Sequence, residues 1–437
     1  MSSLFFFLDE TPPYSQILLR TKDNVTKSCA ACRLRGFAAY NCSPGIQKKQ
    51  EQMIDLEIHE QYPLKDVTTF RIGGPARYFV ELHSVNELLT ALRFAQNFHL
   101  PLCVLGGGSN FLVSDRGFDG LVLKMNLLGR NILEEDAHSI LLKVAAGESW
   151  DALVAYAVNS GWWGIENLSL IPGSVGALAV QNVGAYGQEA SDVIEAVDVY
   201  DIGTKTQMRL SSKECGFAYR ASIFNSCMKD RYIILNTFFR LAKQSTPRLN
   251  YHDFQTAFND NGNVPTLEEI RSAVIDIRRA KLPDIEKIGS AGSFFKNLLL
   301  SAEEFELVHT RIAKQFGHYA TKRIEDCKRS QHNRLAIKLP TALLLDICGL
   351  TGYQVGGAAL YHKHPLIVVN ATGHATAYDV MTLVKHVRHA IYRHTGQRIS
   401  PEPTLIGFKN EELRNYFGLT SQNSRTTPLS LLNQTHV

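Results

Sequence analysis

The sequence has no long apolar run, and this absence bears on the compartment of the protein. A helix that crosses a bilayer needs about 20 apolar residues. The longest apolar run near the start, residues 4–8, has five residues. It also lacks the basic segment before it and the cleavage pattern after it that a secretory signal requires. We therefore expect a cytoplasmic protein with no membrane partner.

The chain also has no large excess of positive or negative charge. The 437 residues hold 46 Lys and Arg against 42 Asp and Glu, which gives a net charge of +4. A nucleic-acid surface usually needs a basic cluster, and no basic run here argues for one. We expect no nucleic-acid partner, so an anionic ligand must be bound by a few local charges.

A disulfide framework is missing as well. The eight cysteines stand mostly alone within apolar patterns, which is typical of reduced thiols. Cys29 and Cys32 form one CxxC, with Cys42 beyond it. A structural zinc site usually has four ligands and a second pair. We expect no bound metal.

What the sequence does contain is enough apolar material for two or three domains, since 45% of its residues are hydrophobic. Residues 1–52 show no sustained periodicity, and we expect them to form a disordered extension. Met53, at the start of the regular pattern, is a second candidate for the true start of the chain. Residues 413–437 read as a polar tail.

Between these ends, helical and strand patterns alternate, which predicts an α+β fold. Capping residues mark five helix starts, at Ser84, Ser149, Thr266, Ser301 and Thr376. In the second of these helices, Leu153, Tyr156 and Ala157 are expected to face the core. Short apolar runs predict strands at 121–125, 140–146, 193–200, 206–210, 231–241 and 366–370.

The segment 167–187, NLSLIPGSVGALAVQNVGAYG, is rich in small residues. Gly173, Gly176, Gly184 and Gly187 can adopt positive φ angles, and bare N–H groups in such turns form concave sites for phosphate oxygens. A cofactor with a diphosphate, such as FAD, would fit a site formed by this segment. The alternative is an ordinary pair of glycine-rich loops.

A second stretch of this kind lies upstream. Residues 102–110, LCVLGGGSN, form an apolar run that ends in three glycines and a Ser-Asn pair, which is typical of a strand leading into a phosphate-binding turn. Two such loops are harder to explain as surface turns than one.

Four further stretches carry candidate reactive side chains. Tyr219 and Arg220 stand in FAYRASIF, and a guanidinium can hold a carboxylate with two hydrogen bonds. Ser293, in GSAGSFFKN, has small neighbours that would let its hydroxyl approach a ligand. Lys281 and Glu402 lie beside prolines. Each residue taken alone is as easily a surface charge, a turn or a helix cap.

Taken in order, these motifs resemble one family. TTFRIGG, VLGGGSN, IPGSVGALAVQNVGAYG, FAYRASIF, RRAKLPD, GSAGSFFKN, GGAAL and PEPTLIG together are similar to the UDP-N-acetylenolpyruvoylglucosamine reductases, from about Met53 to Gly407. Tyr251, which follows Arg220 in the chain, resembles the tyrosine of the form with a substrate-closing loop. The basic stretch 321–334 has no counterpart and no assigned role.

The resemblance implies a two-part FAD-binding region, like that of the vanillyl-alcohol oxidases, and a C-terminal α+β substrate domain. The implied first subdomain is 53–112 with 403–412, the second is 113–282, and the substrate domain is 283–402. It further implies an enzyme of peptidoglycan precursor synthesis. With non-covalent FAD, such an enzyme uses NADPH to reduce UDP-N-acetylglucosamine enolpyruvate to UDP-N-acetylmuramate. We expect a monomer that binds this nucleotide sugar.

The resemblance also implies roles for particular residues. Arg220 and Glu402 would hold the substrate carboxylate, and Ser293 would donate a proton. A carboxyl next to that carboxylate should have a raised pKa. The residues implied to bind the substrate are Tyr219, Tyr251, Lys281, Asn297 and His364. Those implied to bind FAD are Gly106, Gly107, Gly108, Ser109, Asn110, Ile171, Gly173, Gly176, Ala177, Gln181, Asn182, Gly184 and Ala185.

Two other functions stay open on the sequence alone. The chain could be another FAD-dependent oxidase or dehydrogenase on the same scaffold, since fold does not fix substrate. A histidine for covalent flavin attachment would favour that reading, and neither glycine loop has one. The chain could also be a non-catalytic nucleotide-sugar-binding protein, which loss of Ser293 or Arg220 would favour. Both residues are present.

Overall fold

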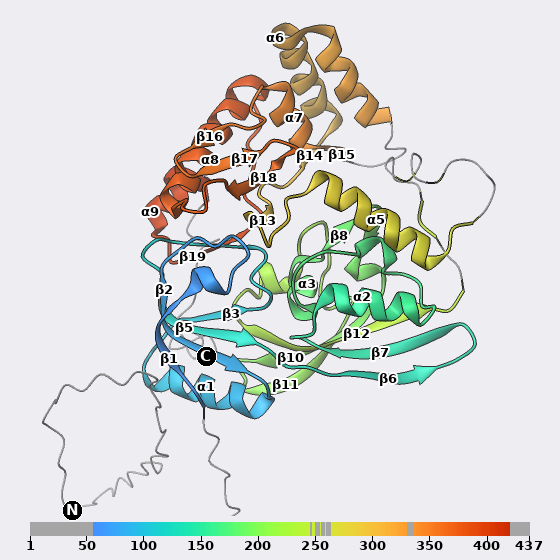
Figure 1. Ribbon diagram of the computed structural model, residues 1–437, viewed down its shortest axis with the longest axis vertical. Coiled ribbons are helices and arrows are strands. Elements are labelled where there is room, and N and C mark those ends of the chain that lie inside the picture. The colour runs from blue at the N-terminus through green and yellow to red at the C-terminus, as the bar shows by residue number, and fades with distance from the viewer. Residues whose placement is uncertain are drawn as a thin grey trace, which may run out of the picture.

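The computed structural model describes residues 56–244, 247–249, 254, 258, 264–329 and 336–419. The expected extension 1–52, Tyr251 and most of the polar tail lie outside these ranges. Within them the structure is a mixture of sheets and helices in three regions (Figure 1), which confirms the predicted α+β class. None of the described helices is both long and apolar enough to span a membrane.

The first region is a four-stranded sheet with one covering helix. Its strands, in spatial order, are β1 (His59–Pro63), β2 (Pro75–Leu82), β5 (Phe118–Met125) and β3 (Leu102–Leu105). Helix α1 (Val85–Asn97) follows β2. The Ser84 side chain accepts a hydrogen bond from the Glu87 N–H at 3.2 Å, which confirms the predicted cap.

The second region is a five-stranded antiparallel sheet. Its order is β11 (Thr206–Ser211), β10 (Ile194–Asp201), β12 (Tyr232–Ala242), β7 (Ser139–Ala145) and β6 (Arg130–Glu135). Helices α2 (Trp150–Asn159), α3 (Val175–Gln181) and α5 (Leu267–Lys281) lie on one side of it (Figure 1). Strands β10 and β11 form a hairpin in which Asp201 pairs with Thr206.

The third region has its own four-stranded sheet, of β13 (Gly289–Ser293), β18 (His364–Asn370), β17 (Ala358–Tyr361) and β16 (Gln354–Val355). Its helices are α6 (Ala302–Arg329), α7 (Thr341–Ile347) and α8 (Ala377–Thr395). A two-stranded ladder joins β14 (Leu298–Leu300) to β15 (Ile337–Leu339). Gly317, at φ 77°, breaks α6 into two arms, and the second arm contains the part of the basic stretch that the structure describes.

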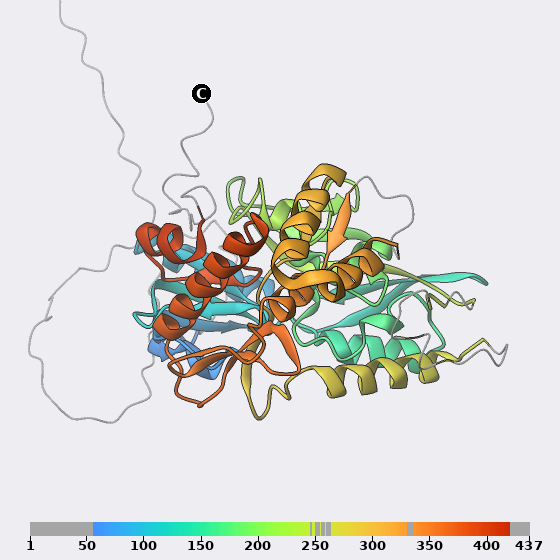
Figure 2. The same cartoon turned by 90° about the horizontal axis from the view of Figure 1, so that it is seen from above.

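The third region packs against the first, although the second separates them in the chain. Strand β19 (Thr404–Ile406) runs parallel to β4 (Phe111–Val113). Phe70, Ile72 and Leu112 share one buried cluster with the helices of the third region. Figures 1 and 2 show the red C-terminal segments beside the blue N-terminal ones. The grouping of 403–412 with the first subdomain stays a prediction.

Several sequence expectations about the fold differ from the structure. Residues 118–125, expected in the second subdomain, form β5 in the sheet of the first region. Ser149 precedes α2 as predicted, but its side chain makes no capping hydrogen bond.

Two further expectations also differ from the structure. Tyr156 does not face the core: it is 37% exposed, and its ring packs on Trp162 and under the Arg130 guanidinium. The polar tail does not begin at residue 413. A short α9 (Asn410–Glu412) continues into a π-helical turn, Leu413–Phe417, because Leu413 and Phe417 are spaced by one turn and both are buried.

One cap connects the first region to the third. The Asp115 carboxylate accepts hydrogen bonds from the backbone N–H groups of Ala377 at 2.7 Å and Tyr378 at 3.0 Å, at the start of α8. These groups have no partner within the helix. The first region thus supplies the helix of the third with two of its N-terminal acceptors.

We predict that Asp115→Ala lowers the free energy of unfolding by about 1–2 kcal/mol, since both capping bonds are lost. Urea titration followed by circular dichroism measures this change. Asp119→Ala is the matched control, because its ion pair with Arg77 is exposed and should contribute at most about 0.5 kcal/mol. Equal effects of the two substitutions would contradict the role given to the cap.

Candidate functional site

The two glycine-rich loops lie directly against each other. A Cβ placed on Gly107 would stand 2.6 Å from the Cα of Gly173. The Ser109 hydroxyl donates to the Pro172 carbonyl at 3.0 Å. No residue with a side chain fits at Gly107 while this contact persists. Segments that are more than 60 residues apart in the chain thus form one surface.

The glycines of this surface serve two different purposes. Gly173 and Gly187 have positive φ angles, 125° and 83°. Gly176 and Gly184 do not. Gly176 is inside α3, where a Cβ would lie 2.8 Å from the Cβ of Ala146, and Gly184 is in β8 (Gly184–Ala185), 2.9 Å from the Gln188 carbonyl. Close packing, not backbone conformation, requires glycine at both positions.

The surface has a buried hydroxyl that no group of the described chain satisfies. Ser174 is 4% exposed, and its Oγ has no hydrogen-bond partner. It faces Gly106, where an added Cβ would stand 2.4 Å from it and 3.1 Å from the Cβ of Ala177. A free donor beside bare backbone suits the oxygens of an anionic ligand. The residues present therefore fit a cofactor with a diphosphate.

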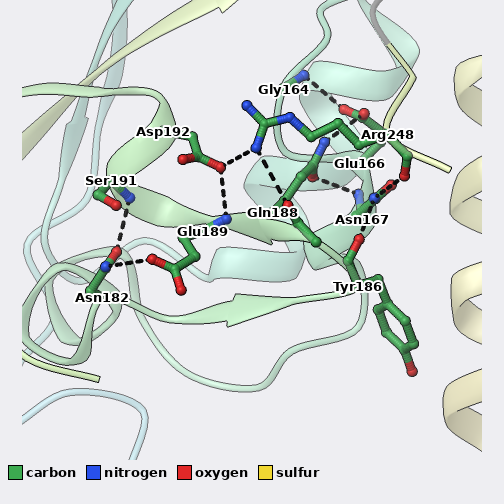
Figure 3. Close-up of polar contacts among 11 residues, drawn as sticks. Gly164, Glu166, Asn167, Asn182, Tyr186, Gln188, Glu189, Ser191, Asp192 and Arg248 are labelled. Carbon is green, nitrogen blue, oxygen red and sulfur yellow. Dashed lines mark hydrogen bonds and ion pairs between the residues drawn. The ribbon is translucent and has the colours of Figure 1, made fainter. Parts of the chain in front are cut away.

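A buried polar network stabilises the glycine-rich segment 167–187 (Figure 3). The Glu166 carboxylate, fully buried, accepts from the Gln188 side chain at 2.7 Å and from the Gly164 N–H at 2.7 Å. Gln188 in turn accepts from the Asn167 N–H at 3.0 Å, and the Asn167 side chain donates to the Tyr186 carbonyl at 2.9 Å. These bonds hold the hairpin of β8 and β9 (Gln188–Glu189) against residues 164–167.

A carboxylate with two partners forms the polar centre of the site. The Nε of Arg220 lies 3.0 Å from Oε1 of Glu402, and the Gln181 side chain donates to the same oxygen at 3.2 Å. The side chains of Arg220 and Glu402 are only 18% and 12% exposed. Three segments meet here: the end of α3, the loop after β11 and the chain before β19. Sequence reasoning singled out all three residues.

Arg220 is held in an unusual backbone conformation. Its φ is 53°, in the left-handed region, within a tight turn that joins Ala218 to Ala221. Its guanidinium donates to the Gly184 carbonyl at 2.7 Å as well as reaching Glu402. Strained residues of this kind are common at functional sites. The turn directs the guanidinium toward the glycine-rich segment.

Burial raises the pKa of Glu402, although Arg220, Gln181 and Lys296 act in the opposite direction. The direction is the expected one, but the cause is burial and not the charge of a substrate carboxylate. Removing a carboxylate from water favours its protonated form. A neighbouring cation only partly offsets this effect here. Glu402 is thus suited to sharing a proton with an adjacent acceptor.

Ser293 is brought to this centre by strand β13. The backbone N–H of Glu402 donates to the Phe294 carbonyl at 2.8 Å, and the Lys296 N–H donates to the Ser400 carbonyl at 3.0 Å. The segments 293–296 and 400–402 therefore run side by side. Ser293 itself is half-buried at the end of β13.

Tyr219 lies on the other side of Arg220. Burial raises its pKa, and it is hydrogen-bonded to Asn297. The Lys338 ammonium lies 4.5 Å from the centre of its ring. Asn297 also accepts from the Thr341 N–H at 3.1 Å. No local pattern singles out Lys338, a lone lysine in a short strand, because its place depends on a contact with Tyr219, 119 positions away in the chain.

The other candidate residues occupy several elements. Lys281 is the last residue of α5, and His364 is the first of β18. Ile171 is half-buried against the core of the second region. Asn182 is buried and ends α3 with a φ of 42°. Tyr251 lies outside the described residues.

This fold and site define a protein with a cofactor-binding region of two sheets and a separate domain that completes the site. Residues 76–211 match the family described as FAD binding domain. Residues 283–406 match the C-terminal domain of UDP-N-acetylenolpyruvoylglucosamine reductase. The two matches fall on the regions that contribute the glycine loops and Ser293.

Proteins that carry the reductase name match across nearly their whole length. The one from Neisseria gonorrhoeae is 37% identical over 345 residues, which is 78% of this chain and 96% of the relative. The one from Flavobacterium johnsoniae is 33% identical over 359 residues, 80% of this chain and 100% of the relative. The chain belongs to the UDP-N-acetylenolpyruvoylglucosamine reductase family, as its motifs predicted.

A solved structure agrees on the fold. The UDP-N-acetylenolpyruvylglucosamine reductase of Thermus caldophilus aligns with a TM-score of 0.56 and 24% identity, over 80% of this chain and 99% of its own. The expected two-part flavin region with a C-terminal α+β domain is confirmed.

The raised pKa of Glu402 has a consequence for stability. A carboxyl with a raised pKa in the folded state contributes stability below its unfolded pKa, about 4.3, and loses it as the pH rises through the folded value. We predict that the unfolding free energy of the wild type, relative to Glu402→Gln, falls as the pH rises above about 4. Urea titrations at several pH values test this.

Glu412 is a control of opposite sign. Its hydrogen bonds with Arg116 lower its pKa, so its contribution should be lost as the pH falls. The same titrations on Glu412→Gln should therefore show the reverse trend. A wild type that gains stability over Glu402→Gln as the pH rises would contradict the raised pKa.

Proposed function

We propose that this protein reduces UDP-N-acetylglucosamine enolpyruvate to UDP-N-acetylmuramate with NADPH, using non-covalent FAD, in peptidoglycan precursor synthesis. The observation that carries the proposal is the Glu402 carboxylate, buried between Arg220 and Gln181 beside the strand of Ser293. Membership of the reductase family supports it over another flavin oxidase on the same scaffold.

The residues that would hold FAD are those of the two apposed loops. They are Gly106, Gly107, Gly108, Ser109, Asn110, Ile171, Gly173, Gly176, Ala177, Gln181, Asn182, Gly184 and Ala185. FAD supplies a carrier for the hydride between NADPH and the enolpyruvyl double bond. Ser174, with its free hydroxyl, is a further candidate that the sequence did not single out.

The substrate carboxylate would be held by Arg220 and Glu402. Hydride addition to an enol ether places negative charge on the adjacent carbon and its carboxylate. A cation at that carboxylate stabilises this charge, and Arg220 provides one. Glu402 keeps Arg220 in place, and its raised pKa lets it share a proton instead of repelling the substrate.

Ser293 would donate the proton to that carbon. A hydroxyl is a weak acid, so it needs a cation or a donor network nearby. Lys296 is three residues further along, and its charge acts on Glu402. The nucleotide sugar would be bound by Tyr219, Tyr251, Lys281, Asn297 and His364. We further propose that the protein works in the cytoplasm as a monomer, without nucleic acid.

We predict that purified wild-type protein releases FAD on denaturation. Gly107→Ala should carry much less, because its Cβ would force the two loops apart. The absorbance of the released flavin, per mole of protein, measures the difference. Gly203→Ala is the control: it lies in the hairpin turn, where a Cβ meets only Asp201 Oδ1 at 3.3 Å. Wild-type protein that takes up no FAD would refute the cofactor assignment.

We predict that Ser293→Ala leaves flavin reduction by NADPH nearly unchanged and slows reoxidation by the enolpyruvyl substrate about 10²- to 10⁴-fold, the usual contribution of a general acid. Only the second step needs a proton at carbon. Stopped-flow absorbance separates the two half-reactions. Equal slowing of both would mean that Ser293 supports the fold or the flavin site. If neither half-reaction is slowed, another residue donates the proton, and Lys296 is the next candidate.

A further inference from the structure

Residues 67–70 lie between a glycine loop and the strand of Ser293, and Thr69 is bonded to both. Its N–H donates to the Gly108 carbonyl at 3.1 Å. On the other side, its hydroxyl donates to the Ser290 carbonyl at 2.6 Å, and its carbonyl accepts from the Ser290 N–H at 2.9 Å. A single residue thus bridges two segments that are about 180 positions apart in the chain.

The contacts around these bonds leave no room for adjustment. A Cβ on Gly108 would lie 2.2 Å from the Val67 carbonyl oxygen. A Cβ on Gly289 would lie 2.4 Å from the Phe70 carbonyl oxygen. Both the loop and the strand therefore rest on the backbone of residues 67–70. Displacement of this segment must displace one or both of them.

Strand β13 is well placed to depend on Thr69. Among the strands that the structure describes it is an edge strand, paired only with β18 in its sheet, and its register shifts between Ser290 and Ser293. An irregular edge strand has few hydrogen bonds to a neighbouring strand that could fix its position. The two bonds with Thr69 fall on Ser290, three residues before the proposed proton donor.

We propose that Thr69 is a positioning residue whose hydroxyl holds Ser293 at a fixed place relative to the loop of Gly106 to Asn110. This inference rests on the proposed function. The two backbone bonds of Thr69 can be made by any residue except proline. Only the 2.6 Å bond to the Ser290 carbonyl requires its side chain. A shift of about 1 Å in a reacting group can cost on the order of 100-fold in rate.

The test compares Thr69→Val, which keeps the shape and loses the hydroxyl, with Thr69→Ser, which keeps the hydroxyl. Thr69→Val should slow flavin reoxidation by the enolpyruvyl substrate about 10- to 100-fold, with flavin reduction by NADPH within about twofold of wild type. Thr69→Ser should restore reoxidation. FAD titrated onto apoprotein, followed by flavin fluorescence, should bind the wild type and Thr69→Val equally well.

Thr68→Val is the matched control. The Thr68 hydroxyl donates to the Leu64 carbonyl at 3.1 Å, within its own turn. Its loss should lower stability in urea without a selective effect on reoxidation. If Thr69→Val does not fold, Thr69→Ala is subjected to the same measurements against Thr69→Ser.

Three results for Thr69→Val would overturn the inference: unchanged reoxidation, equal slowing of both half-reactions, or weakened FAD binding. A Thr68→Val variant with the same selective defect would also overturn it. Failure of the proposed function is seen separately, because wild-type protein would then not transfer hydride from NADPH to the enolpyruvyl substrate at all.

Discussion

The buried carboxylate of Glu402 is the constraint on which the arrangement of the site depends. Moving a charge out of water is costly unless opposite charge and hydrogen bonds replace the solvent. Arg220 and Gln181 provide these, and they come from two other segments of the chain. Each partner requires the others in place. The left-handed conformation of Arg220, which costs roughly 1–3 kcal/mol, is maintained within the same set of contacts.

The order of the regions in space explains how Ser293 and the glycine loops come together. The third region packs on the first, through a shared apolar cluster and the cap that Asp115 gives to α8. The second region meets the third at polar contacts such as that of Gln181 with Glu402. The proposed proton donor is therefore fixed to one cofactor loop, while Arg220 belongs with the other.

Much of the fold and of the candidate site could be predicted from local sequence. Helix caps such as Ser84 and Thr376 depend on neighbours three residues away, so short patterns predict them. The two glycine loops and the Arg220, Ser293 and Glu402 set followed from small-residue runs and motif order. Two predictions that were wrong concern burial, which depends on tertiary contacts. Tyr156 fits a helical apolar face but is exposed, and Leu413 with Phe417 lie in a polar stretch but are buried.

The glycines show why a motif alone does not reveal its physical cause. A positive φ and a close approach both select glycine, and the sequence is the same in either case. Gly173 is there for its backbone conformation, whereas Gly107 and Gly176 leave space for a neighbouring segment. Such loops suit any ligand with a diphosphate. The choice of reaction must therefore come from residues outside them, and here the buried pair of Arg220 and Glu402, next to the strand of Ser293, provides chemistry that the loops lack.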